Sequence, residues 1–153
     1  MKKYVVILLL SISCVLCSCG SKKKELATFD FTQSHIGPIE TGDLKLAHGE
    51  LLSINQNDGT VVVKAKITSN LTNEMTINQN YYSISALIRN NGFNTCNEIQ
   101  YWAVADMTSG EESKVISFTV PKDVIDKIYS GAIVDNKIGD YVTDLWIHPS
   151  LQK

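Results

Sequence analysis

"TINQNYYSISALIRNNG", from Thr76 to Gly92, distinguishes this chain from an all-β protein, because its apolar residues follow a helical period. Those residues recur at intervals of four, three and four positions, and they are Ile77, Tyr81, Ile84 and Ile88. Thr76 and Gln79 match a capping box, and Gly92 follows the last periodic residue, where a left-handed glycine commonly ends a helix. We therefore predict a helix over residues 76–92.

Strand-like alternation precedes this helix. Residues 44–54 and 60–68 read as two strands, and "NQNDG" between them contains the Asp-Gly pair that tight hairpins favour. Gly49 predicts a bulge in the first strand. The second strand has one face with Val61, Val63, Ala65 and Ile67, and another with Val62, Lys64, Lys66 and Thr68. We therefore expect a β-hairpin before the helix.

A second hairpin follows the helix. Residues 98–107 alternate with apolar side chains on both faces, which is typical of a central strand, and residues 114–120 return with Ile116, Phe118 and Val120 inward. Pro121 ends this strand and opens a short helix that stops at Gly131. The apolar residues of that helix are Val124, Ile125, Ile128 and Tyr129. A last strand is expected around residues 144–148.

The element order predicts an α+β fold. Two hairpins are not stable separately in water, so we expect one mostly antiparallel sheet, completed by the last strand, with both helices on one face. Phe29 and Phe31 alternate in residues 27–33, where we expect an edge strand. The alternative is an immunoglobulin-like β-sandwich with helical insertions.

The amino terminus has the parts of an export signal. Met1 is followed by Lys2 and Lys3, and residues 4–16 are almost wholly apolar, although this run is shorter than the roughly 20 residues of a membrane span. The alternatives are an ordinary secreted protein and an uncut single-span anchor.

The end of this signal, Leu16-Cys17-Ser18-Cys19, resembles the lipobox of bacterial lipoproteins. The resemblance implies a diacylglyceryl group on Cys19 and cleavage just before it. We therefore divide the chain into a signal peptide over 1–18, a lipidated amino terminus and tether over 19–42, and one globular domain over 43–151. The expected localisation is the extracytoplasmic face of the cell membrane.

The net charge and the cysteine content of the processed chain exclude some kinds of partner and site. Of 14 Lys and Arg, two leave with the signal, so 12 remain against 16 Asp and Glu, a balance of −4. This acidic balance argues against nucleic-acid binding, which favours a basic face. Cleavage leaves Cys19 and Cys96 as the only cysteines, so we expect no intramolecular disulfide and no cysteine-rich metal site. Cys96 is expected to be a half-buried apolar residue, and the alternative is a reactive or intermolecular thiol.

The sequence contains no motif of catalysis or of metal binding. Neither a G-x-S-x-G, an H-E-x-x-H, a P-loop nor a G-x-G-x-x-G occurs, and His35, His48 and His148 are scattered. We therefore predict no enzyme activity, no cofactor and no metal. The carboxylates near the turns are read as solvated groups, although oxygen ligands of this kind also bind extracellular Ca²⁺.

The candidate binding surface consists of Trp102, Trp146 and Tyr82, because large aromatic side chains often anchor interfaces. For each of the three, packing in the core is favoured over exposure. Residues 61–82 and 98–125 resemble a group of small, uncharacterised surface lipoproteins of Gram-positive bacteria, a resemblance that implies no particular activity. We expect a lipid-anchored binding domain for an envelope protein or wall component. The alternatives are a solute- or Ca-binding lipoprotein and a cell-wall hydrolase.

Overall fold

A computed structural model of the chain describes residues 27–152, so the predicted signal peptide, Cys19 and the first part of the predicted tether lie outside the described residues. The elements are β1 (Ile36–Pro38), β2 (Glu50–Asn57), β3 (Thr60–Lys66), α1 (Asn73–Asn90), η1 (Phe93–Thr95), β4 (Glu98–Asp106), β5 (Glu112–Pro121), α2 (Lys122–Tyr129), η2 (Asp135–Asp140), β6 (Thr143–Ile147) and η3 (Pro149–Leu151). None of the helices within these residues is long and apolar enough to cross a membrane.

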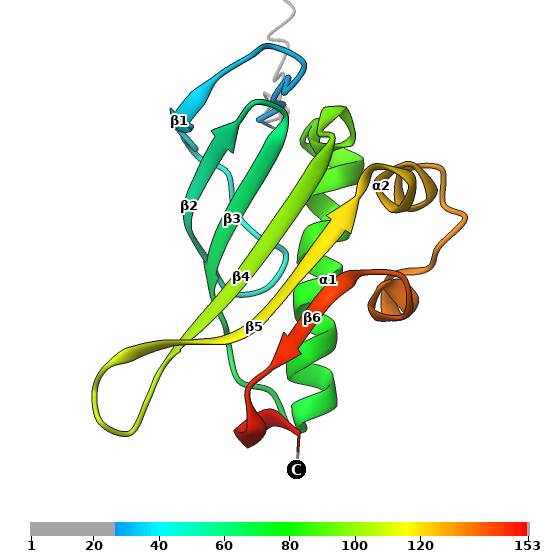
Figure 1. Cartoon of the computed structure of the whole chain (residues 1–153). Coiled ribbons are helices and arrows are strands. Elements are labelled where there is room, and N and C mark those ends of the chain that lie inside the picture. The colour runs from blue at the N-terminus through cyan, green and yellow to red at the C-terminus, as the bar shows by residue number, and fades with distance from the viewer. Residues whose placement is uncertain (1–26, 153) are drawn as a thin grey trace, which may run out of the picture.

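The strands form one six-stranded sheet in the order β1-β2-β3-β4-β5-β6 (Figure 1). All neighbouring strands are antiparallel except β3 and β4. These two are parallel because α1 returns the chain to the edge of the sheet at which β3 begins. Helices α1 and α2 contact each other, and Figure 1 shows α1 running behind the sheet. The predicted α+β fold is confirmed, and the structure is a single sheet rather than a sandwich.

The β2–β3 hairpin has the predicted turn, because Asp58 and Gly59 both have positive φ, 48° and 87°. The predicted bulge is displaced from Gly49 to Leu52, where the register shifts between Leu51 and Ser53. Leu52 is the extra residue of this bulge, so its side chain points away from the core and is 38% exposed. The hairpin was therefore predictable from local sequence, but its bulge was not.

Helix α1 begins before the predicted capping box. Thr72 is the amino-terminal cap, and its side chain accepts a hydrogen bond from the backbone N–H of Met75 at 3.1 Å. Thr76 lies inside the first turn, where its hydroxyl donates to the Thr72 carbonyl. Gly92, with φ 84°, follows the end of the helix as predicted.

The predicted strand over residues 27–33 is wrong, because this segment packs against the end of α1 instead of joining the sheet. The N–H of Phe29 donates to the Asn91 carbonyl, and the Asn91 amide donates to the Ala27 carbonyl. Phe31 is buried, with its ring 4.8 Å from that of Phe93. The part of the predicted tether from residue 27 onwards therefore belongs to the folded domain.

The core lies between the sheet and the two helices. It includes Ile116, Phe118 and Val120 as predicted, and burial raises the pKa of Tyr101, which faces it from β4. Tyr129, expected on the buried face of α2, is exposed. Cys96, expected to be half-buried, is fully buried, and this raises the pKa of its thiol to about 12.

Candidate functional site

No helix within residues 27–152 covers the face of the sheet opposite α1, and we call this face the open face (Figure 1). Successive side chains of a strand point to opposite faces, so the residues between the core positions of β3, β4 and β5 point outward. The open face includes Val62, Lys64, Lys66, Glu98, Gln100, Trp102, Val104, Asp106, Glu112, Lys114, Ser117, Thr119 and Trp146. Val104 is buried beneath its neighbours on this face.

Both tryptophans of the chain lie on this face. Trp102 on β4 pairs with Ser117 of β5, and Ser117 pairs on its other side with Trp146 of β6. Trp102 is 42% exposed and Trp146 is 41% exposed, so the preference for packing in the core was wrong for both. The reason is that both helices cover the other face, toward which Tyr101 points.

Lys114 lies between the two indoles. Its Nζ is 5.7 Å from the ring centroid of Trp102 and 5.4 Å from that of Trp146, within the range of a cation–π interaction. Each such contact at an exposed site contributes about 0.5–1 kcal/mol. Trp102, Lys114 and Trp146 therefore form one connected group, which we call the tryptophan cluster.

Lys114 has no ion pair with any residue in 27–152, unlike its neighbours on the open face. Lys64 pairs with Glu112 at 2.6 Å and Lys66 pairs with Asp106 at 2.7 Å. The hydrogen bond that the Lys66 ammonium donates to Asp106 raises the pKa of Lys66, which keeps that amine charged. At the tryptophan cluster, the ammonium of Lys114 is therefore the charged group that has no ion pair within residues 27–152 and that a partner could bind.

The alternation of residues along β5 does not predict that Lys114 lies on the open face. This lysine lies two residues before Ile116 and should share the core face with it, but the register shifts between Ala103 and Val104. Val115 is the extra residue on β5, and it is buried. The bulge therefore moves Lys114 to the open face, beside Trp102, and nothing in the local sequence signals it.

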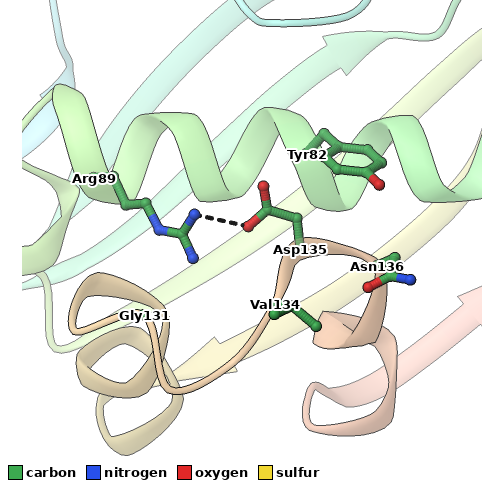
Figure 2. A pocket seen from close by; sticks show the side chains of 6 residues that line it. All are labelled: Tyr82, Arg89, Gly131, Val134, Asp135 and Asn136. Carbon is green, nitrogen blue, oxygen red and sulfur yellow. Dashed lines mark ion pairs between the residues drawn. The ribbon is translucent and has the colours of Figure 1, made fainter.

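Tyr82, the third predicted surface residue, lies far from the tryptophan cluster in the fold. It is 40% exposed and lines a hollow of about 450 Å³ between α1 and the segment that joins α2 to η2 (Figure 2). This hollow is on the helical side of the sheet. The structure therefore brings Trp102 and Trp146 together and leaves Tyr82 at a separate place.

The charged groups of that hollow bind one another. Figure 2 shows the ion pair between Arg89 and Asp135, whose atoms are 3.0 Å apart. Arg89 also donates to the carbonyls of Ile128 and Ile133 at 3.0 and 3.2 Å. The hydroxyl of Ser85 donates to Asp135 at 2.7 Å. These contacts hold the α2–η2 connection against α1.

Within residues 27–152, no three His, Cys, Asp or Glu side chains gather into a metal-binding group. His148 lies edge-on to Trp146 with ring centroids 6.0 Å apart, and its Nδ1 contacts the Ser150 hydroxyl at 2.8 Å. Its ring is thus held by the turn that follows β6.

No protein family, curated protein or solved structure matches this chain. Its function is therefore inferred from the residues of the open face and from the sequence of its amino terminus.

Proposed function

We propose that the chain is a lipid-anchored, non-catalytic domain of the bacterial envelope, which binds an envelope protein or wall component through its open face. The observation that carries the proposal is the tryptophan cluster, in which two partly exposed indoles flank one cation. Tryptophan is one of the residue types enriched among the anchors of interfaces. Two of them on an uncovered sheet face offer a partner a compact apolar area to bury.

The proposed anchor rests on the lipobox resemblance around Cys19. Several acyl chains bind a bilayer far more tightly than one, because each buried methylene contributes about 0.8 kcal/mol. Lys22, Lys23 and Lys24 follow Cys19 after Gly20 and Ser21, and each adds up to about 1 kcal/mol of attraction to anionic lipid head groups. The folded domain is then held at the extracytoplasmic face of the membrane.

The test compares the full chain with variants of its open face. The chain, carrying a carboxy-terminal tag, is solubilised from bacterial membranes and incubated with solubilised envelope and with isolated wall fragments. Trp102→Ala/Trp146→Ala should lose the bound component. Tyr129→Ala is the matched control, because Tyr129 is an exposed aromatic residue on α2.

Equal capture by wild type and by the double tryptophan variant would overturn this assignment of the open face. Melting curves of all variants show whether a loss of capture reflects unfolding. Because both tryptophans are about 40% exposed, we expect the double variant to remain folded.

A second candidate is small-solute binding in the hollow beside Tyr82. Its volume of about 450 Å³ is that of ordinary ligand pockets. The polar groups on its floor, Arg89 and Asp135, already bind each other, which is why this candidate ranks second. A thermal-shift screen with Ca²⁺ and small solutes, repeated on Tyr82→Ala, tests it.

A further inference from the structure

We propose that the partner of the open face is an acidic glycan, a chain of sugar rings that carries carboxylate groups, with Trp102 and Trp146 under two of its rings and Lys114 on a carboxylate. This inference rests on the proposed function and narrows it to one chemical class of wall component.

The spacing of the indoles fits a chain of rings. Trp102 and Trp146 stand on strands separated by β5, so their backbones lie two strand steps apart, about 10 Å. That is about the length of a disaccharide. The C–H groups on the face of a sugar ring carry partial positive charge, and the face of an indole carries partial negative charge. Each indole is partly exposed and complements such a ring, and the Lys114 ammonium, which lies over both indoles in the free chain, would then move to the carboxylate of the sugar.

The polar groups of the cluster favour an acceptor-rich ligand. The indole N–H groups and the Lys114 ammonium can only donate hydrogen bonds. The half-buried hydroxyl of Ser117 lies between the two indoles and can donate as well. A carboxylate can only accept, and its hydrogen bond to an ammonium is charge-assisted. Since Lys114 has no ion pair within residues 27–152, its charge complements an anionic group on the ligand.

An acidic peptide fits this face less well. The backbone groups of β4 and β5 are used by the sheet, so a peptide lying across the tryptophans would find few partners for its own N–H and C=O groups. A sugar ring differs, because its hydroxyls lie at its rim and stay in water while its face covers the indole.

A membrane surface also fits less well. Recognition of anionic lipids uses clusters of about four to eight basic residues. On the open face Lys64 and Lys66 form ion pairs with Glu112 and Asp106, so Lys114 is the one cation of this face that has no ion pair within residues 27–152. The observations therefore favour the glycan.

The test titrates the full chain in detergent with tetragalacturonate, a carboxylated tetrasaccharide, and follows tryptophan fluorescence. Both tryptophans of the chain belong to the cluster, so the signal reports on this site directly. The comparison ligands are the methyl ester of the same tetrasaccharide, an acetylated Gly-Glu peptide of equal charge, and phosphatidylglycerol vesicles. We expect saturable binding of tetragalacturonate that weakens with salt.

Lys114→Met removes the charge and keeps an apolar side chain. It should weaken tetragalacturonate binding about tenfold, the loss expected for one charge-assisted contact, and it should bind the acid and the ester equally. Lys114→Arg should retain most of the affinity. Lys45→Met is the control, because Lys45 is an exposed lysine before β2. By calorimetry, Trp102→Ala and Trp146→Ala should each lose about tenfold or more.

No saturable binding of tetragalacturonate at about 10 mM, a concentration that detects contacts of only a few kcal/mol, would overturn the inference. So would tighter binding of the peptide or of the vesicles, or equal loss in Lys114→Met and Lys45→Met. If wild type captures an envelope protein through Trp102 and Trp146 but does not bind the tetrasaccharide, the glycan inference fails and the proposed function stands.

Discussion

Trp102 and Trp146 lie on strands that are not neighbours, yet each is the register partner of Ser117. The residue before Trp102, Tyr101, points the other way, where its hydroxyl donates to Asn80 at 3.1 Å in the core. Tyr101 thus contributes to the core of the fold, whereas Trp102, the next residue of β4, contributes to the open face. This separation lets the stability of the fold and the chemistry of the open face be tested independently.

Tyr101→Ala and Trp102→Ala should therefore differ sharply in stability. Removing the buried Tyr101 ring should lower the free energy of unfolding by about 3–5 kcal/mol, because it leaves a cavity. Removing the exposed Trp102 ring should lower it by less than about 1.5 kcal/mol. Urea unfolding followed by far-UV circular dichroism measures both. Equal losses would contradict the placement of these side chains.

Gly92→Ala should be far more damaging than Gly131→Ala. The two glycines have nearly the same positive φ, 84° and 80°, so backbone strain of about 1–2 kcal/mol is common to both. A Cβ on Gly92 would overlap the carbonyl of Phe29, whereas a Cβ on Gly131 would meet nothing within 4 Å. We expect Gly92→Ala to lose at least about 2 kcal/mol more in urea unfolding. Similar losses would show that Phe29 does not cross there.

The Cys96 thiol should make stability fall at high pH. Its pKa is about 12 in the folded chain, against 9.0 for an exposed thiol, so the unfolded chain loses this proton first as the pH rises. The stabilisation is therefore complete below about pH 9 and is lost between about pH 9 and 12. Burial also raises the pKa of Tyr101, which acts in the same direction. The difference in pH dependence between wild type and Cys96→Ala isolates the thiol.

The same burial should protect Cys96 from thiol reagents. At pH 8 we expect labelling of this residue by a disulfide reagent to be slow in the folded chain and fast in urea. Fast labelling without denaturant would contradict its placement in the core.

Arg89→Lys should loosen the connection between α2 and η2. A lysine cannot donate at once to the carbonyls of Ile128 and Ile133 and to Asp135, as the guanidinium does. We expect a loss of about 1–2 kcal/mol and faster hydrogen exchange in residues 130–140. Lys137→Met removes an exposed pair and should cost less than about 1 kcal/mol. Unchanged exchange in Arg89→Lys would disprove this role.

Cys19→Ser should abolish anchoring, whereas Cys17→Ser should not. The lipobox resemblance places the lipid on Cys19 and removes Cys17 with the signal. Labelling with radioactive palmitate, membrane fractionation and the mass of the mature amino terminus report the outcome. An intact leader, or lipid on Cys17, would contradict the assignment.

The sequence alone was sufficient where one segment contains its own signal. Asp58-Gly59 supplies the positive φ of the hairpin, the helical spacing of Tyr81, Ile84 and Ile88 determines the buried face of α1, and Gly92 marks the helix end. The alternation in residues 98–107 separates Tyr101 from Trp102. These features depend on backbone geometry and side-chain direction over a few residues, which the order of residues determines directly.

The sequence was not sufficient where distant segments meet. Only the tertiary structure shows that β3 and β4 pair in parallel, that residues 27–33 pack against α1, and that a bulge at Val115 turns Lys114 outward. The meeting of Trp102 and Trp146 at Ser117 depends on two strand registers at once. A register is set by packing along the whole sheet, and one extra residue moves every later side chain to the opposite face. For that reason the parts of the open face were visible in the sequence, but their assembly around Lys114 was not.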